Sequence, residues 1–351
     1  MSFQEKILSK SNSYNYYKEK NEYLVKEIED LKKEIEELKE DKEIILKEEF
    51  LRQYGLYTGF CGWNYVNYFF REDFEDKLKE VTKNLDKESK DTFKWLLLRA
   101  LVVNVMKMDS VHFDSELKEQ EEFLDFRFKY SAPNEIAGYK YIGRYNVHAF
   151  MDTTFTDEDK EFIKDKDIID AGAFTGDTSI PIAQFTNKKI YAFEPFEDSF
   201  EILKENISSN NIENIVPVKK SLGNIDGERT LYLSGDNVQG ITSNANARKY
   251  DEELKVEEVT IDTFVKENNL EVGYITVDVE GAEMDLLEGA VETLKTQKPI
   301  LTISMYHKVT DFFDIIPWIA NLDLGYEFEV VKENPWPFIS DTVVKCRAKQ
   351  R

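Results

Sequence analysis

Short β-branched runs alternate with helical segments from about residue 160 onward, and this alternation constrains the fold more than any other feature of the sequence. The pattern predicts helices over residues 199–206 and 283–296. It predicts an α/β fold with a mainly parallel sheet, helices on both faces, and ligands at the carboxyl ends of the strands. Two more β-like pieces, residues 230–233 and 256–261, predict a hairpin insertion near the sheet edge. The expected strands are residues 167–170, 189–193, 215–218, 274–277, 300–305, 327–331 and 342–346.

A heptad repeat marks the N-terminal segment. Leucines recur at one heptad position and isoleucines at the other, which is typical of a coiled-coil seam. Ile at position a with Leu at position d favours two parallel strands, and Glu27 then faces Lys32 of the partner. We therefore expect residues 1–50 to form a coiled-coil stalk that joins a homodimer; the alternative is one long amphipathic helix that packs on its own body. The seam residues are Leu24, Leu31, Leu38 and Ile45 at one position and Ile28 and Ile35 at the other.

A helical region is predicted to follow over residues 51–135. Apolar residues between 74 and 85 share one helical face, and Asp91 is expected to cap the next helix. The aromatic cluster at residues 65–70 is expected in the core rather than on a binding surface. Proline and glycine punctuation near residue 135 predicts a boundary, so that residues 136–351 form the domain that contains the sheet.

Charge and composition exclude several classes of protein. Lys and Arg total 46 against 69 Asp and Glu, and the net charge of −23 repels phosphate backbones, which excludes nucleic acid as the main substrate. The strongest apolar stretch, residues 95–106, includes Arg99 and is too short to span a bilayer. Because the N-terminus also lacks a signal-peptide core, we expect a cytoplasmic protein without a membrane segment. Two distant cysteines and three scattered histidines predict neither a disulfide framework nor a structural zinc site.

A glycine loop follows the first strand of the predicted sheet. Asp170, Gly172 and Gly176 lie in DAGAFTGDTS, directly before a helix, where backbone amides can approach a ligand closely. Only two glycines, four residues apart, are present, so the loop departs from the dinucleotide fingerprint. An acid here would repel a pyrophosphate but suits a cation, and adenosylmethionine carries both a sulfonium and an ammonium group. Glu194, eighteen residues after Gly176, ends the next strand, where a carboxylate can accept both ribose hydroxyls of an adenosine.

A second group of chemically active residues lies at two later strand ends. Asp278 and Glu280 flank one valine in VDVEGAE, and Gly281 lets the chain turn into the following helix. A simple helix cap needs one short polar side chain rather than two carboxylates. His307 follows the next strand, so all three side chains are expected beside the same crevice.

These motifs resemble those of the FkbM-type methyltransferases. The runs DAGAFTGDTS, YAFEP, SLGNIDG, TIDTFV, VDVEGAEMDLLEGA and SMYHKVTDFFDIIPWI occur in this order within residues 160–347. The resemblance implies a class I methyltransferase Rossmann-like fold with a mostly parallel seven-stranded sheet. It also implies adenosylmethionine as donor and a hydroxyl acceptor, often on a sugar of a surface glycan. The positions that match the family's donor site are Asp170, Gly172, Ala173, Phe174, Thr175, Gly176, Asp177, Glu194, Pro195, Ser221, Leu222 and Asp278, and those nearest the acceptor are Asp278, Glu280 and His307.

The sequence leaves the mechanism of hydroxyl activation open. His307, expected to be neutral near pH 7 and oriented by Asp278 or Glu280, is the candidate base. Asp278 is the alternative base, or a ligand for a divalent cation that holds the hydroxyl. Two other function classes stay as hypotheses. One is a coiled-coil assembly protein whose methyltransferase-like domain binds ligand but is inactive; the other is an NAD-dependent oxidoreductase, which the missing third glycine opposes.

Overall fold

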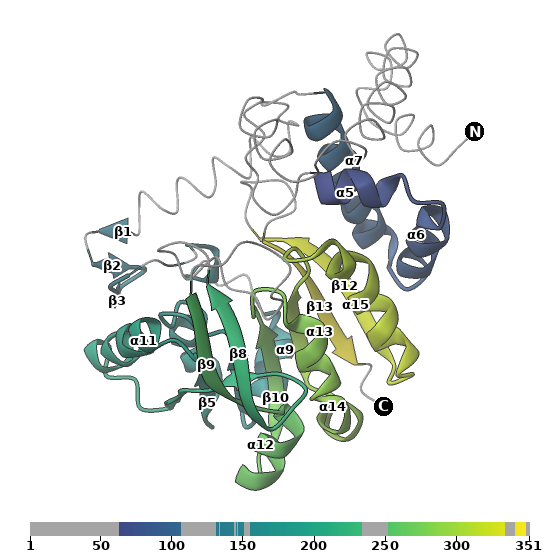
Figure 1. The fold of residues 1–351 in the computed structure, drawn as a ribbon. Helices are drawn as coiled ribbons and strands as arrows, with labels where there is room; N and C mark the ends of the chain where they lie inside the picture. The colour runs from purple at the N-terminus through teal and green to yellow at the C-terminus, as the bar shows by residue number, and fades with distance from the viewer. Residues whose placement is uncertain are drawn as a thin grey trace.

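The computed structural model describes residues 63–106, 131–132, 134–143, 145, 147–150, 155–233, 252–333 and 341–348 (Figure 1). The predicted coiled coil over residues 1–50 lies outside the described residues, so the coiled coil and the dimer stay predictions. No helix within the described ranges is long and apolar enough to cross a membrane.

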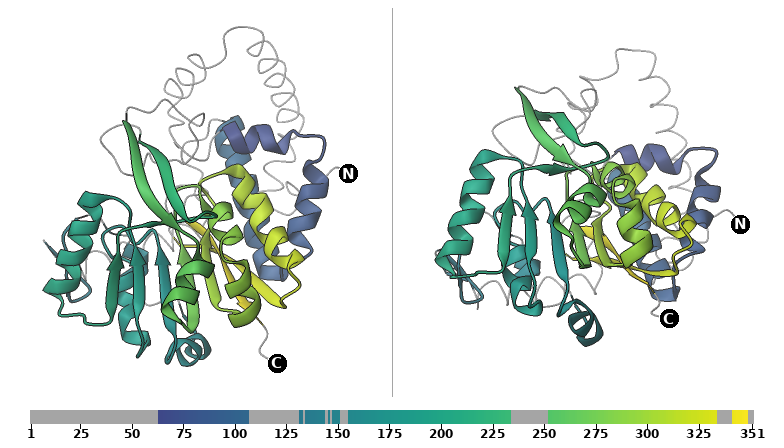
Figure 2. Two further views of the ribbon diagram at one scale, coloured as in Figure 1. Left: turned by 60° about the horizontal axis from the view of Figure 1, so that its bottom comes forward. Right: turned by 90° about the horizontal axis from the view of Figure 1, so that it is seen from below.

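A seven-stranded sheet forms the centre of the molecule and confirms the predicted fold class (Figures 1 and 2). Neighbouring strands are parallel except β13, which is antiparallel to both β11 and β12. All seven predicted strands are present within two residues of their predicted ends. Their spatial order is β12 (Tyr326–Lys332), β13 (Thr342–Ala348), β11 (Ile300–Ser304), β10 (Val272–Val277), β4 (Asp167–Ala171), β5 (Ile190–Phe193) and β6 (Ile215–Val218).

Helices cover both faces of this sheet because side chains alternate along each strand. Ile168 packs with α9 (Asp157–Ile163), α10 (Ser179–Ile182) and α11 (Glu197–Ser209), whereas Ile169 faces the opposite core. That second core contains α12 (Ile261–Asn268), α13 (Glu283–Glu288), α14 (Val291–Gln297) and α15 (Val309–Asn321). Two short 3-10 helices, η1 (Val147–Phe150) and η2 (Ala183–Phe185), lie on the first side. The half of the chain that contains this sheet thus has the predicted arrangement, with helices on both faces.

The single helix predicted over residues 283–296 is wrong, because the chain forms two helices, α13 and α14. They are separated at Gly289, where a Cβ atom would lie 2.0 Å from the carbonyl oxygen of Gly223. The second helix has its own cap: Asp262 accepts the backbone N–H groups of Glu292 and Thr293 at 2.9 and 2.7 Å. Close packing and a remote cap, neither visible in local periodicity, divide the segment.

Three helices precede the sheet: α5 (Trp63–Phe69), α6 (Phe74–Thr82) and α7 (Lys87–Met106). The aromatic cluster at residues 65–70 is buried at Tyr65, Tyr68 and Phe69, as predicted. Tyr68 stacks on Phe313 of α15 with ring centroids 4.4 Å apart, so these helices share a core with the sheet. The boundary near residue 135 stays a prediction.

The predicted cap at Asp91 is wrong. The helix α7 begins at Lys87, and Asp91 lies inside it. Asp86 instead accepts the backbone N–H of Ser89 at 2.7 Å, which satisfies one of the free amides of the first turn.

The predicted hairpin pairs as expected but belongs to a separate sheet (Figure 2). Strands β8 (Gly227–Leu233) and β9 (Glu252–Val259) are antiparallel, and β7 (Ser221–Leu222) pairs in parallel with β9. Ile261 starts α12 rather than ending a strand. Another small sheet, β1 (Ser131–Ala132), β2 (Glu135–Ile136) and β3 (Tyr139–Lys140), precedes the main sheet.

Candidate functional site

The carboxyl ends of β4, β5 and β10 meet in one place, as the sequence predicted. After β4, the N–H groups of Gly172 and Ala173 both donate to the Phe193 carbonyl on β5, at 3.1 and 2.8 Å. On the other side, the Asp278 N–H donates to the Ala171 carbonyl at 2.9 Å. The glycine loop is therefore fixed to both neighbouring strands.

Close backbone approach explains the first glycine of the loop. Gly172 has φ +83°, and an added Cβ would lie 1.9 Å from the Asp278 carbonyl oxygen. Phe174 and Gly176 also have positive φ, at 47° and 93°. A loop with three such residues is tight, and only a residue without a side chain can meet Asp278 at this distance.

Asp170 is enclosed within the loop. Its side chain is 2% exposed, and the Ser179 hydroxyl donates to it at 2.5 Å. Burial raises the pKa of Asp170 to about 7, although the Ser179 hydrogen bond lowers it. The sequence placed this acid correctly but missed Ser179, which follows DAGAFTGDT directly.

Glu194 lies at the end of β5, also buried, at 4% exposure. Its carboxyl accepts the Phe196 N–H at 2.9 Å. Burial raises the pKa of Glu194 to about 8, against the lowering effect of the Phe196 and Phe174 amides. Pro195 beside it is half-buried. Within the described ranges no Lys or Arg pairs with this carboxyl group, which is costly to bury, so its place at the strand ends calls for a functional reason.

Two of the predicted donor residues, Ser221 and Leu222, lie in β7 of the smaller sheet. Leu222 is a buried core residue, and Ser221 is half-buried with its hydroxyl 3.4 Å from the Glu257 carbonyl oxygen. Asp177 is half-buried at the end of the glycine loop, and its charge raises the pKa of Asp170 further.

His307 lies next to Asp278 and Glu280, as predicted, but its surroundings differ from the prediction. Its side chain is 2% exposed, and Nε2 lies 3.3 Å from Asp278 Oδ1 and 3.6 Å from Glu280 Oε2. Nδ1 lies 2.7 Å from an oxygen of Glu283. Burial alone would lower the pKa of His307, but the charges and hydrogen bond of these carboxylates raise it to about 10. The expected neutral imidazole is therefore wrong: three acids around one buried ring favour the imidazolium.

Glu283 is a second site residue that sequence reasoning missed. It is the first residue of α13 and its side chain is fully buried. One carboxyl oxygen accepts the N–H groups of Val279 and Gly281 at 3.3 and 3.2 Å besides contacting His307. Burial would raise the pKa of Glu283, but the imidazolium lowers it below its ordinary value. The available signal was the third acid of VDVEGAE.

Asp278 is the open member of this group, since about half of its side chain, 51%, is exposed. The Tyr306 hydroxyl lies 3.2 and 3.4 Å from its two carboxylate oxygens. The turn after it carries Glu280 and Gly281 at φ 52° and 98°, which aims the Glu280 side chain back toward His307. Asp278, Glu283 and His307 also offer ligand atoms within 4.8 Å of one another, a donor set that suits a divalent cation.

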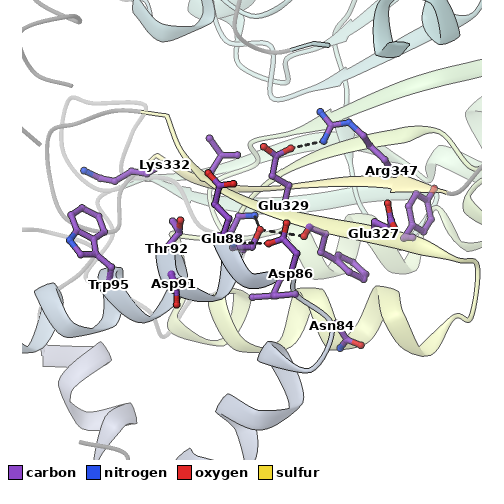
Figure 3. Close-up of a pocket in the computed structure, with 16 residues that line it drawn as sticks. Asn84, Asp86, Glu88, Asp91, Thr92, Trp95, Glu327, Glu329, Lys332 and Arg347 are labelled. Atoms are coloured by element: carbon purple, nitrogen blue, oxygen red, sulfur yellow. Dashed lines mark hydrogen bonds and ion pairs between the residues drawn. The ribbon is translucent and has the colours of Figure 1, made fainter. Parts of the chain in front are cut away.

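A separate groove of about 960 Å³ lies between α7 and β12, at the outer edge of the sheet (Figure 3). Acidic residues of both elements line it, among them Asp86, Glu88 and Glu329, and Arg347 is paired with Glu329 at 2.6 Å. It contains none of the predicted site residues. The groove is therefore separate from the strand ends that hold those residues.

Comparisons with known proteins agree with this geometry. Residues 170–328 match the family model of the methyltransferase FkbM domain. The structure resembles methyltransferase FkbM from Methylobacillus flagellatus KT with a TM-score of 0.51 at 17% identity, over 81% of this chain and 62% of that protein. This chain thus spans less than two thirds of that protein's length, and the likeness shows the fold.

Two further solved structures are less similar. One is an rRNA methylase from Streptococcus thermophilus, with a TM-score of 0.35 at 12% identity over 55% of this chain and 93% of that chain. The other is a protein from Streptococcus mutans, assigned as a methyltransferase, in complex with SAH; its TM-score is 0.34 at 13% identity, over 54% and 95% of the two chains. No curated protein matches the sequence.

Proposed function

We propose that this chain is an adenosylmethionine-dependent O-methyltransferase, because residues 170–328 match the family model of the methyltransferase FkbM domain. Its acceptor in this proposal is a hydroxyl group, of a sugar in a surface glycan or glycoconjugate. The observation that carries the proposal is the juxtaposition of the buried acids Asp170 and Glu194 with the half-exposed Asp278 at adjoining strand ends.

The donor side fits adenosylmethionine better than a dinucleotide. The loop from Asp170 to Asp177 contains no Lys or Arg to meet a pyrophosphate, and Glu194 can accept the hydroxyl groups of a ribose. The bound donor supplies a methyl group already activated by positive sulfur. Asp170 is enclosed with Ser179, so its role is to fix the loop whose backbone and side chains surround the donor.

On the acceptor side, the exposed fractions of the two side chains favour Asp278 over His307 as the base. A ring that is 2% exposed cannot reach an acceptor, whereas half of the Asp278 side chain is open. In this proposal the acceptor hydroxyl gives its proton to an Asp278 oxygen as the oxygen–methyl bond forms and the methyl–sulfur bond of the donor breaks, which leaves neutral adenosylhomocysteine. The Tyr306 hydroxyl and His307 Nε2 both contact the Asp278 carboxylate and fix its position. Glu283 in turn fixes the His307 ring through Nδ1.

Transfer of labelled methyl from adenosylmethionine to a panel of glycans tests the proposal. Asp278→Asn should lower turnover by on the order of 10²-fold, far more than it changes adenosylhomocysteine affinity. Asp198→Asn, an exposed acid on α11, is the matched control. Tight binding of NAD in place of adenosylhomocysteine would remove the proposal. Donor binding without transfer to any acceptor would favour the alternative of an assembly protein with an inactive domain.

A divalent cation at Asp278 is the second mechanism, and the clustered ligand atoms of Asp278, Glu283 and His307 favour it. It requires that the cation displace a proton from the His307 ring, since only the neutral imidazole can be a ligand. A cation would hold the acceptor hydroxyl and lower its pKa. This mechanism predicts loss of activity on treatment with EDTA and recovery with Mg²⁺ or Mn²⁺. Full activity after chelation, with no metal remaining by elemental analysis, rules it out.

We also propose that the N-terminal heptads join two chains in parallel. The support is the Ile and Leu seam with its charge pairs across the interface. Light scattering should report a dimer for the full chain and a monomer for a chain that begins at Tyr54. An equally dimeric truncated chain would place the interface elsewhere.

A further inference from the structure

An extended segment that precedes the family-matched region is attached to helix α11 by two asparagines. Asn206 accepts the Ile142 N–H at 2.9 Å and donates to the Ile142 carbonyl at 3.0 Å. One helical turn later, Asn210 accepts the Lys140 N–H at 2.8 Å and donates to its carbonyl at 2.7 Å. Asn206 and Asn210 are four residues apart, a rise of about 6 Å along a helix. Lys140 and Ile142 are two residues apart, about 6.7 Å along an extended chain, so each asparagine side chain lies beside one of these two residues.

This attachment places Tyr141, between the two held residues, against the glycine loop. Its hydroxyl lies 2.6 Å from the Thr175 hydroxyl, and both side chains are almost fully buried, at 2% and 1% exposure. Asn206 also donates to the Thr175 carbonyl at 2.9 Å. Thr175 is thus held twice, by its side chain and by its backbone, from outside the loop.

The position of Thr175 explains why two external contacts matter. It lies between Phe174 at φ 47° and Gly176 at φ 93°. A left-handed conformation is unfavourable for a residue with a side chain, such as Phe174. Without contacts to hold it, such a loop would relax, and a ligand would have to restore its shape on binding.

We infer that Tyr141 and Asn206 are donor-positioning residues, which hold the glycine loop in its binding conformation before the donor arrives. The inference rests on the proposed function and extends the donor site to residues 139–143, outside the family match at residues 170–328. Neither residue needs to touch the donor; both act through Thr175.

A purely structural role for Tyr141 is the competing interpretation, because its ring packs edge-on against Tyr145 and Phe150, at 5.4 and 5.6 Å between centroids. The test therefore keeps the ring. Tyr141→Phe removes only the hydroxyl, Thr175→Val removes its partner, and Tyr145→Phe removes a neighbouring tyrosine hydroxyl as the matched control. Calorimetry with adenosylhomocysteine on the full chain, well below each variant's melting temperature, gives the dissociation constants.

We expect Tyr141→Phe and Thr175→Val each to raise the dissociation constant about fivefold to tenfold, which corresponds to the loss of one hydrogen bond. The double variant should be no weaker than the weaker single variant, since both remove the same contact. Tyr145→Phe should bind like the wild type. Amide hydrogen exchange of residues 170–178 without ligand should rise in Tyr141→Phe.

Three outcomes would overturn the inference. A lower melting temperature for Tyr141→Phe with an unchanged dissociation constant would make the contact structural only. Additive losses in the double variant would show that the two hydroxyls act separately. Failure of the wild type to bind adenosylhomocysteine would remove the proposed function as well, which distinguishes the two failures.

Discussion

Replacing Glu194 with Gln should make the protein more stable at alkaline pH and weaken donor binding at the same time. Glu194 is 4% exposed and its pKa is raised from 4.5 to about 8 by burial. A carboxyl with a raised pKa in the folded state favours folding only while it is protonated. Stability is therefore lost progressively as the pH rises from about 4.5 to 8 and stays lost above that range.

The magnitude follows from the two pKa values. Ionising this carboxyl at pH 9 costs the folded state up to roughly 5 kcal/mol relative to the unfolded chain. The amide of Gln avoids that cost, and its oxygen still accepts the Phe196 N–H. Its NH₂ group then faces the Phe174 N–H, which loses its acceptor, and this destabilises the folded state by about 1–3 kcal/mol. We expect a net gain of about 2–4 kcal/mol at pH 9 and a net loss of up to about 2 kcal/mol at pH 5, where ionisation costs the folded state only about 1 kcal/mol.

Urea unfolding at pH 5 and pH 9 measures this difference directly. The matched control is Glu205→Gln, which replaces an exposed acid in α11. It should change the free energy of unfolding equally at both pH values. Calorimetry should show weaker adenosylhomocysteine binding for Glu194→Gln than for Glu205→Gln. An equal gain at both pH values would refute the reasoning about burial, and unchanged affinity would refute the ribose contact.

Two further changes test the site at other points. Substituting His307→Ala should destabilise the protein by about 3–5 kcal/mol in urea unfolding, because it leaves the fully buried Glu283 without its cation; a variant as stable as the wild type would mean that the pair contributes nothing. Substituting Gly172→Ala should abolish adenosylhomocysteine binding in calorimetry, because its Cβ would lie 1.9 Å from the Asp278 carbonyl oxygen; normal affinity would show that this close approach is not needed.

The strands, and the polar residues that follow their carboxyl ends, could be predicted because both depend on local patterns. A buried parallel strand is a short β-branched run, and its carboxyl end is where the next polar residues occur. Asp170, Glu194 and Asp278 were therefore placed correctly at adjoining strand ends.

The partners of those residues could not be predicted, because they come from remote parts of the fold. Glu283 meets His307 only because α13 folds back beside the end of β11. Once that contact exists, the ring has a buried anion on one side and two more acids on the other, which reverses the expected protonation. A sequence pattern shows which groups titrate but not how deeply each is buried or what faces it.

The same limit applies to LEGA, one of the most specific parts of the resemblance to the FkbM family. Its glycine, Gly289, packs against the Gly223 carbonyl, and Gly223 itself lies over the buried carboxylate of Glu258. Arg229 bonds that carboxylate and also Asp285 of α13, at 2.8 and 3.0 Å, so one guanidinium joins the smaller sheet to the helix that carries Glu283.

The glycine and the acids around it therefore set where α13 begins relative to β7–β9. Glu283 is the first residue of that helix and contacts His307, which in turn contacts Asp278. A displacement of the helix at Gly289 would therefore move Asp278 through these two contacts. The specificity of such a motif reflects backbone packing that the chemistry depends on rather than groups that react. A family signature is thus strongest evidence for the fold, and the reacting groups have to be identified from burial and exposure at the strand ends.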